Sequence, residues 1–580
     1  MIELEPVVQL RGVAAASGIA IGPAFWLETT LMHVQRRQVD DIGQELLRLT
    51  EARRRARAEL EQLQSHVAAT ISVAEAGIFE AHLAFLDDPV LFDEVEERCR
   101  LQQCNIETAL SEVFDRYSGM LQATDDELFR ARANDLLDVK RRLLRLLIGS
   151  AEQRITLPDE SCIVLAEDLL PSEVVQLDRS RVLGICLTEG GPTSHVAILA
   201  RSLGLPAIVG LGKGLAAVKT GTLLVVDGSA GLLVVNPSDQ TLQSYRAQYE
   251  RERNRRIRER AAAQSLATTH DGVRIAVLAN LSSLAEVEEA VANGAEGVGL
   301  LRTELLFLDR DHPPSEEEQL SVYNRIAAAL GERPLVIRTL DIGGDKPVPY
   351  LRQPPEQNPA LGVRGVRLAQ HDPELLRMQI RAIWRIETNR SVKVMFPMVS
   401  TLEEVYWLRK LVIEVGAELR AAGIATLDRL EMGVMIEVPA LALMVDHVSR
   451  VVDFISIGTN DLTQYAVAVD RNNMPLHKLG DSLHPAILRL VAHIVRTAEA
   501  NGAAVSVCGE AAGDQLGMPL LVGLGVKTLS VSPALIPGVK AALHTLNSIR
   551  ARAVAEHAMN LATAAEVRAY AGTVWSGLFA

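Results

Sequence analysis

The segment TEGGPTSHVAILARSLGLPAIVG, residues 188 to 210, combines glycines, a Thr-Ser-His triplet and an apolar run with helical spacing. A serine nucleophile at Ser194 would need an elbow such as Gly-x-Ser-x-Gly with a separate histidine and acid, which GPTSHV does not supply. A zinc site would need more His or Cys residues at ligand spacing than TSHVAIL offers. The residue types in this segment therefore favour neither serine-based hydrolysis nor zinc binding.

The segment instead predicts a helix that begins at the triplet, after a glycine-rich loop. His195 would lie in the first helical turn, and Thr193 could cap the unpaired backbone amides. Such amides and the helix dipole favour a phosphate dianion. A neutral imidazole, with an unperturbed pKa of about 6.5, can attack phosphorus. His195 is therefore a candidate phosphoryl carrier, and the alternative is a capped helix with an incidental exposed histidine.

Apolar runs of β type alternate with mostly helical segments over the C-terminal half of the chain. They are RIAVLAN, GVGLLRTE, PLVIRTLDIGG, GVRGVRL, VKVMFPM, EMGVMIEV, FISIGTND and AVSVCGEAAG. This alternation predicts a (β/α)8 barrel. An open doubly wound sheet is the alternative, although it usually has fewer strands.

Polar residues gather at the carboxyl ends of these runs, where the active sites of barrels lie. They are Asn280, Arg302 with Glu304, Arg338 with Asp341, Arg364 with Arg367, Glu437, Asn460 with Asp461, and Cys508 with Glu510, followed by Arg471 in AVAVDRNN. Because an unpaired charge in an apolar strand is costly, several arginines at one mouth imply a bound anion. The alternative is a set of ordinary salt bridges between Arg302, Arg338 and Arg364 and the neighbouring carboxylates.

Two carboxylates and one thiol suggest what happens to that anion. Glu437 and Asp461 end successive predicted strands, with Asn460 beside them, which is an oxygen-ligand set suited to Mg²⁺ bound partly through a substrate phosphate. With the arginines, they suggest a small phosphorylated acid as the ligand. Cys508 ends the last predicted strand, where a thiol could exchange a proton with a substrate carbon. Its alternative role is that of a buried strand cysteine.

The chain divides into regions of different character. Short β segments occupy residues 7 to 30, and residues 39 to 150 have almost no Gly or Pro and show the helical spacing of a bundle. Strand patterns return near residue 155, so we expect the bundle to be inserted into one α/β domain made of residues 1–38 and 151–244. A charge-laced helical linker at 245–270 and a barrel domain at 271–580 would follow.

Composition limits the partners of the chain. It has 59 basic and 73 acidic residues and a formal net charge of −14, which gives nucleic-acid binding little support. No apolar stretch approaches the roughly 18 residues of a membrane span, and MIELEPVVQL does not look like a signal peptide. Five scattered cysteines fit a reducing cytosol, so we expect a cytoplasmic protein. GLGKGL and GVGLLR are incomplete as nucleotide motifs.

Taken together, these segments resemble the Enzyme I family of the bacterial sugar phosphotransferase system, the phosphoenolpyruvate-protein phosphotransferases. The resemblance covers essentially the whole chain. It rests on GGPTSHVAILARSLGLPAIVG, GVGLLRTE, IRTLDIGGDKP, NPALGVRGVRL, MIEVPA, SIGTNDLTQYAVAVDRNN and VCGEAAGD. The Thr-Ser-His motif alone also resembles pyruvate phosphate dikinase and phosphoenolpyruvate synthase. Pro192 departs from the family, in which many members have a polar or basic residue at this position.

The resemblance implies a role for each candidate residue. His195 would accept the phosphoryl group of phosphoenolpyruvate (PEP), and Cys508 would protonate the enolpyruvate carbon. PEP would be held by Arg302, Arg338, Asn460, Asp461 and Arg471, and Mg²⁺ by Glu437 and Asp461.

The resemblance also implies partners and an architecture. The helical block would dock the phosphocarrier protein HPr, the α/β phosphohistidine domain would swivel, and the TIM barrel would form a homodimer. Three alternatives remain open at this stage. They are the Enzyme I part of a fused multiphosphoryl transfer protein, an ATP-linked synthase or dikinase, and a non-catalytic carrier that senses PEP.

Overall fold

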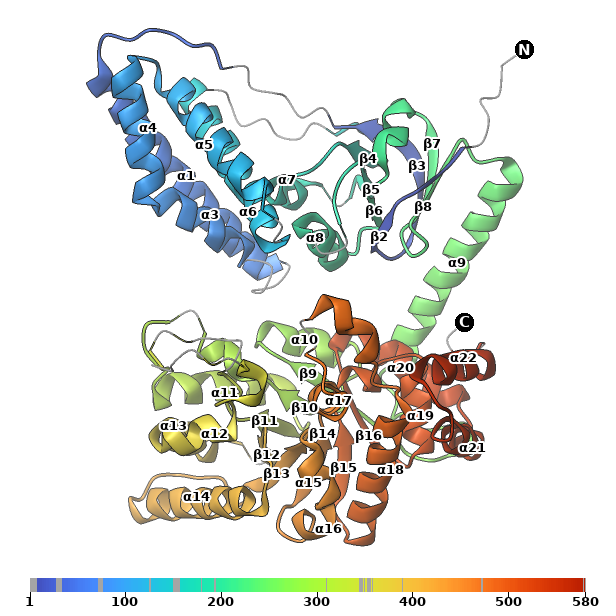
Figure 1. The fold of residues 1–580 in the computed structure, drawn as a ribbon. Helices are drawn as coiled ribbons and strands as arrows, with labels where there is room; N and C mark the ends of the chain where they lie inside the picture. Colours follow the sequence, from blue (N-terminus) through green and yellow to red (C-terminus); the bar gives the residue numbers. More distant parts are fainter. Residues whose placement is uncertain are drawn as a thin grey trace. The chain divides into compact units, whose positions relative to one another are not determined.

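The computed structural model of the chain describes residues 8–27, 34–70, 77–124, 127–149, 157–178, 180–191, 194–308, 310–343, 348, 350–351, 356, 358–388, 390–470, 473–576 and 578. The chain forms two compact units, Met1–Arg253 and Asn254–Ala580 (Figure 1). Within the described ranges, no helix has the length and apolar content needed to cross a lipid bilayer.

A block of helices forms one part of the first unit, as the sequence predicts. Its helices are α1 (Ile42–Thr70), α3 (Ile78–Asp87), α4 (Pro89–Gln102), α5 (Ile106–Gln122) and α6 (Glu127–Ile148). They lie side by side around a core that includes Phe79, Phe92 and Phe114 (Figure 1). The apolar residues at helical spacing are thus buried against one another.

A mixed sheet forms the other part of this unit. Its strands are β1 (Val8–Arg11), β2 (Val13–Ala16), β3 (Ile19–Trp26), β4 (Cys162–Ala166), β5 (Val182–Leu187), β6 (Ala207–Val209), β7 (Leu223–Asp227) and β8 (Leu232–Val235), in the order β1-β8-β7-β3-β4-β5-β6-β2. Strand β3 pairs in parallel with β4, with Ala24 opposite Ile163. The helical block is therefore inserted between two adjacent strands of one sheet, as expected from the sequence.

Alternate residues of the central strands bury opposite faces of this sheet. Val164 and Ile185 pack with Ala197 of α8 (His195–Leu203), and α7 (Pro171–Gln176) covers the same face. Ile163 and Cys186 pack on the other face. The sheet therefore supplies the rigid base from which α8 begins.

Helix α9 (Asp239–Ala262) confirms the charge-laced helix predicted between the two regions. None of its residues is buried. Leu242 and Tyr245 near its start pack against Ile19, Val225 and Val234 of the sheet, and the rest of the helix depends mainly on local propensity and charge pairs.

A closed barrel of parallel strands forms the second unit (Figure 1). The strands are β9 (Ala276–Leu281), β10 (Val298–Leu301), β11 (Leu335–Arg338), β12 (Val392–Phe396), β13 (Glu431–Ile436), β14 (Phe454–Ile457), β15 (Ala504–Val507) and β16 (Thr528–Val531). The predicted (β/α)8 barrel is thus confirmed, and the alternative of an open sheet is wrong.

Helices follow most of the barrel strands and surround them. They are α10 (Ala285–Ala292), α11 (Glu316–Leu330), α12 (Val366–His371), α13 (Pro373–Trp384), α14 (Leu402–Ala421), α15 (Pro439–Leu443), α16 (Val445–Val448), α17 (Thr459–Val467), α18 (Pro485–Ala500), α19 (Gly517–Gly523), α20 (Ile536–Thr545), α21 (Ser548–Ala558) and α22 (Ala564–Val574). Apolar side chains between the strands and these helices form one continuous core.

One predicted strand was wrong and one strand was missed. The segment GVRGVRL, predicted as a strand, instead leads into α12, and Gly365 lies just before that helix with φ +56. A left-handed backbone at this position interrupts an extended run. The eighth strand is β16, with the four-residue sequence TLSV. Cys508 therefore follows the seventh strand of the barrel and not the last.

A buried lysine fixes the chain just after α9 to the barrel unit. The amine of Lys540, 1% exposed, donates to the carbonyls of Ala263 at 2.7 Å and Ser265 at 2.9 Å. It also lies 3.3 Å from the Glu296 carboxylate. Because Ala263 is fully buried, its carbonyl has no ready replacement from water, whereas Ser265 is exposed.

We predict that Lys540→Met lowers the free energy of unfolding of the barrel unit by about 1–3 kcal/mol, since it leaves the buried Ala263 carbonyl unpaired. Denaturant unfolding followed by tryptophan fluorescence measures this. The control is Lys527→Met, because Lys527 pairs with Glu499 at 2.7 Å while both side chains are more than half exposed. It should change stability by less than about 0.5 kcal/mol. Equal losses for the two variants would contradict the anchoring role.

Candidate functional site

An open cavity at the carboxyl ends of the barrel strands gathers the residues that the sequence singled out. It contains about 820 Å³ of empty space and is lined by Leu300, Arg302, Glu304, Arg338, Asp341, Arg364, Met435, Glu437, Gly458, Asn460, Asp461, Cys508, Gly509 and Glu510. All the barrel residues predicted as site residues line it except Arg471, which lies outside the described residues. Strand topology explains this, because the strands are parallel and their carboxyl ends meet at one mouth.

Two of the three arginines in this cavity are already paired with carboxylates. Arg338, the last residue of β11, lies 2.6 Å from Glu304 and 3.2 Å from Asp341. Burial would lower the pKa of Arg338, but these carboxylates outweigh it and hold the pKa above its ordinary value. Arg364 lies 3.0 Å from Asp341 and 3.4 Å from Asp461. The two alternatives raised by the sequence therefore hold together for Arg338 and Arg364. Each forms salt bridges with carboxylates, and both line the same cavity.

Arg302 differs from them. It follows β10 directly and its side chain is exposed. No hydrogen bond or ion pair joins its guanidinium to any other described residue. Arg302 is thus the arginine of this cavity whose donors remain available to a ligand.

The cavity has more carboxylates than arginines. Arg302, Arg338 and Arg364 face the carboxylates of Glu304, Asp341, Glu437, Asp461 and Glu510. An anionic ligand would therefore meet an excess of negative charge if all these groups were ionised. Binding an anionic ligand in this cavity therefore requires either protonation of a carboxylate or an added cation.

Glu437 is the carboxylate that most needs compensation. Its side chain is fully buried, and its Oε1 accepts the backbone N–H of Met398 at 2.6 Å. Its Oε2 is buried and has no hydrogen-bond partner among the described residues. Burial, together with the Asp461 and Asp341 carboxylates, raises the pKa of Glu437 above its ordinary value. A buried, unpaired carboxylate oxygen at a cavity wall is a fitting ligand for a cation.

A magnesium ion suits the pair formed by Glu437 and Asp461. Among the described residues, no cluster of three or more His, Cys, Asp or Glu side chains is placed to hold a metal. Mg²⁺ does not require one, because it is often bound through one or two carboxylates while water and substrate phosphate complete its shell. Glu437 follows β13 and Asp461 follows β14, and these strands are paired with Ile436 opposite Ile457. The donor set therefore fits the group.

Cys508 is held as a protonated thiol at the cavity floor. It is 4% exposed, and its Sγ accepts a hydrogen bond from Ser456 Oγ at 3.3 Å. Burial raises the pKa of the thiol above its ordinary value, and the Ser456 hydrogen bond only partly offsets this. Cys508 is therefore both a buried cysteine and a residue of the cavity lining, so the two interpretations of it are compatible.

Two polar residues from the predicted rim lie elsewhere. Asn280 lies within β9 and does not line the cavity, but its Nδ2 donates to the Cys508 carbonyl at 3.0 Å and to the Ser530 carbonyl at 3.1 Å. Arg367 donates to the carbonyls of Leu361 and Gly362. Asn280 thus supports the backbone of Cys508, and Arg367 holds a loop.

Asn460 and Glu510 hold one another across the mouth. The Nδ2 of Asn460 donates to Glu510 Oε1 at 3.1 Å, and its Oδ1 accepts the Glu510 backbone N–H at 2.9 Å. An amide nitrogen has two N–H donors, so one remains for a ligand.

His195 is the first residue of α8, as the sequence predicts. The N-cap is Ser194, whose Oγ accepts the Ala197 N–H at 3.3 Å, and not Thr193 as expected. Thr193 and Pro192 lie outside the described residues. Helix α8 ends at Gly204, whose φ of 68 gives the left-handed cap common at helix ends.

Family models match most of the chain. Residues 11–132 match the N-terminal domain, 158–231 the mobile domain and 256–548 the PEP-binding domain of PEP-utilising enzymes. The chain therefore has the domain set of a PEP-utilising enzyme.

Curated relatives narrow the class further. The chain is 40% identical over 571 residues to the phosphoenolpyruvate-protein phosphotransferase of Geobacillus stearothermophilus, covering 98% of each chain. It is 37% identical to that of Bacillus subtilis, covering 97% of this chain and 99% of the relative. A multiphosphoryl transfer protein of Rhodobacter capsulatus is 42% identical, with 96% of this chain matching 67% of that protein. The chain belongs to the phosphoenolpyruvate-protein phosphotransferase family.

The state of Cys508 leads to a pH-dependent prediction. Because burial raises the pKa of its thiol, iodoacetamide should modify Cys508 slowly at neutral pH and faster only at a pH above the ordinary pKa of a cysteine. Peptide mapping by mass spectrometry follows the modification, and Cys508→Ser identifies the peptide. Cys186, which is fully buried in the first unit, reports unfolding if it reacts. Rapid modification of Cys508 at pH 7 in the folded protein would show that it is a thiolate and contradict this prediction.

Proposed function

We propose that this chain transfers the phosphoryl group of PEP to His195 and then to a histidine of an HPr-like phosphocarrier protein, releasing pyruvate. The observation that carries the proposal is the cavity at the barrel mouth, where Arg302, which has no ion-pair partner among the described residues, lies with the Glu437–Asp461 pair and the Cys508 thiol. Each of these residues stands at a position that matches the family's motifs.

Arginine and amide donors would bind PEP. Within the described part of the chain, the Arg302 donors have no partner, and Asn460 retains one N–H for an oxygen of the substrate. We assign the same role to Arg338 and Arg471, and a supporting contact to Asp461. Planar guanidinium groups match the oxygens of a carboxylate or phosphate in pairs.

Glu437 and Asp461 would hold Mg²⁺ beside the bound substrate. When bound, the ion would offset the excess of carboxylates and neutralise charge on the transferred phosphoryl group. The residues of the chain then have two tasks, to fix the phosphate and to keep its phosphorus accessible to an attacking imidazole.

His195 would attack the phosphorus in line, and the bond from phosphorus to the enol oxygen would break. The resulting enolpyruvate needs a proton at its methylene carbon to become pyruvate. Cys508 is protonated at neutral pH because burial raises its pKa, so it is suited to donate that proton. Solvent would return the proton to the thiolate.

The remaining assignments concern domains and partners. We propose that residues 39–150 dock the phosphocarrier, that residues 1–38 and 151–244 carry His195 between partners, and that 245–270 connect them to the barrel domain at 271–580. Homodimerisation through the barrel is part of the proposal and rests on the resemblance to the family, and a cytoplasmic location rests on the five scattered cysteines. We propose no nucleic-acid or membrane partner.

A second candidate is the same activity within a longer fused protein. It is favoured by the relative from Rhodobacter capsulatus, in which the matching region makes up 67% of a multiphosphoryl transfer protein. In that case the phosphocarrier would be a domain of the same polypeptide.

The transfer to His195 can be tested with labelled PEP. We predict that His195→Ala takes up no label from ³²P-PEP in the presence of Mg²⁺, because the accepting nitrogen is gone. The control is His447→Ala, since His447 is a half-exposed histidine near the end of α16. It should be labelled like the wild type, and pyruvate should form in step with the label. Substantial labelling of His195→Ala would overturn the assignment.

The metal assignment can be tested with one substitution at each end of β13. We predict that Glu437→Gln raises the Mg²⁺ concentration needed for half-maximal labelling by at least about ten-fold, because it removes a charged ligand. The fold should persist, since the amide can still accept the Met398 N–H and no longer buries a charge. Addition of EDTA should abolish labelling of the wild type.

The control for this test is Glu431→Gln at the opposite end of β13. Glu431 pairs with Lys393 at 2.7 Å, away from the cavity, so its loss should leave the Mg²⁺ requirement unchanged. An unchanged requirement for Glu437→Gln would remove Glu437 from the metal site.

A further inference from the structure

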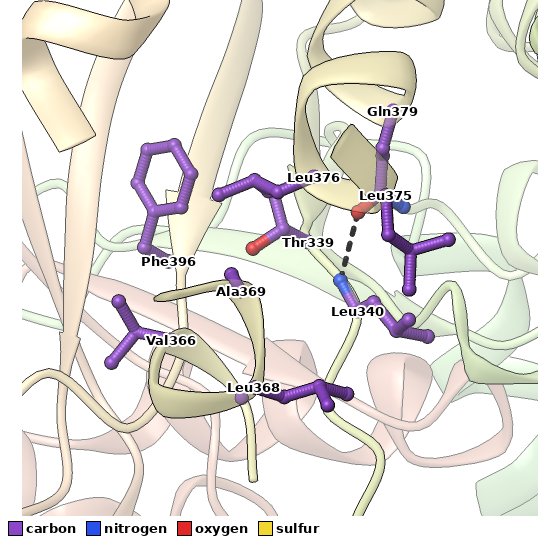
Figure 2. Close-up of a pocket in the computed structure, with 10 residues that line it drawn as sticks. Thr339, Leu340, Val366, Leu368, Ala369, Leu375, Leu376, Gln379 and Phe396 are labelled. Carbon is purple, nitrogen blue, oxygen red and sulfur yellow. Dashed lines mark hydrogen bonds between the residues drawn. The ribbon is translucent and has the colours of Figure 1, made fainter. Parts of the chain in front are cut away.

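A buried amide on α13 connects two of the three segments that carry the cavity arginines, those of Arg302 and Arg338. Gln379 is 1% exposed. Its Oε1 accepts the backbone N–H of Leu340 at 2.9 Å, as the dashed line in Figure 2 shows. Its Nε2 donates to Thr303 Oγ1 at 3.1 Å and to the Tyr323 hydroxyl at 3.1 Å. One side chain thus links three separate elements.

Thr303 and Leu340 are each adjacent in sequence to a residue that lines the larger cavity. Thr303 lies between Arg302 and Glu304, and Leu340 directly precedes Asp341. The Thr303 hydroxyl also donates to the Arg338 carbonyl at 2.9 Å. The distance between the segment 302–304 and the segment 338–341 is therefore set by hydrogen bonds that converge on Gln379.

The hydrogen-bonded network behind the rim is buried. Thr303 is 1% exposed, and Tyr323 and Gln319 are fully buried. The Tyr323 hydroxyl donates to Gln319 Oε1 at 3.3 Å, and Gln319 Nε2 donates to the Pro314 carbonyl at 3.0 Å. In a buried network of this kind, a displaced partner leaves donors or acceptors unsatisfied, so the network favours a single arrangement.

The surroundings of Gln379 offer few substitutes for its side chain. The small cavity beside it is lined mainly by apolar side chains, among them Val366, Leu375 and Phe396 (Figure 2). If Gln379 were lost, these groups could not accept a hydrogen bond from the Leu340 N–H. The 338–341 segment would then lose a fixed point just behind Asp341.

We infer that Gln379 is a positioning residue for PEP binding and phosphoryl transfer, because it fixes the spacing between the Arg302 and Arg338 segments. This inference rests on the proposed function. It concerns the same cavity, but it assigns the geometry of the rim to a helix residue that touches neither substrate nor metal. A displacement of about 1 Å at a binding group can cost about a hundred-fold in rate.

The decisive variant is Gln379→Met, which keeps an unbranched side chain of similar length and removes all three hydrogen bonds. The value of kcat/KM for PEP, measured by labelling of His195, should fall between about ten-fold and about a hundred-fold. Phosphoryl exchange between phosphorylated HPr and His195 should remain at the wild-type rate, because it does not use the barrel cavity.

Two further variants separate positioning from stability. Tyr323→Phe removes the arm of the network that leads away from the rim, and its kcat/KM for PEP should match the wild type although its melting temperature falls. Thr303→Val removes the hydroxyl shared by Gln379 and Arg338, and it should reproduce the kinetic loss of Gln379→Met even if the latter folds poorly.

Wild-type kinetics for Gln379→Met or Thr303→Val would overturn the inference. So would equal kinetic losses for these variants and Tyr323→Phe, since packing alone would then explain them. A wild-type enzyme that takes up no label from PEP would instead overturn the proposed function, so the two failures are distinguishable.

Discussion

The constraint on which the site depends is the burial of many charges of both signs at one end of a barrel. Arg338 and Arg364 are each bound by two carboxylates, and Asp341 serves both. Such an arrangement costs solvation energy that close pairing recovers only when geometry is good. Glu437 is the group for which pairing is incomplete, because its Oε2 has no partner among the described residues. The charge balance of this cavity thus supports the proposal that it binds a cation and an anion together rather than either alone.

The backbone of the barrel sets this geometry. Parallel strands deliver the charged residues to one mouth, while polar residues just outside the cavity hold them. Asn280 fixes the Cys508 carbonyl, Met398 donates to Glu437, and Gln379 spans two loops. Met398 has a φ of 59, a left-handed conformation that is rare for a residue with a side chain. Strain of this kind persists where the surroundings enforce it, and here it directs an N–H toward a buried carboxylate.

The barrel and most of its cavity residues could be predicted from the sequence, because polar residues come directly after the apolar runs that form the strands. Runs such as EMGVMIEV and FISIGTND place a carboxylate just after an apolar strand, and the barrel brings those ends together. The segment GVRGVRL misled because apolar residues near glycines resemble a short strand, whereas the backbone at Gly365 turns into a helix. Strand β16 is no shorter than several strands that were predicted, but its sequence TLSV is half Thr and Ser and so does not form a continuous apolar run. Gln379 gives no signal in PELLRMQIRAIW, since its role arises from partners 39 and 76 residues away.

The same charge balance explains why a separate unit would carry the phosphoryl group. A phosphohistidine is an anion, and the cavity residues left after pyruvate departs have more carboxylates than arginines. That cavity would therefore favour release of the phosphorylated imidazole. His195 begins a helix capped by Ser194, where N-terminal amides and the helix dipole stabilise negative charge. The N-terminus of α8 would thus stabilise the phosphohistidine charge that the barrel cavity disfavours.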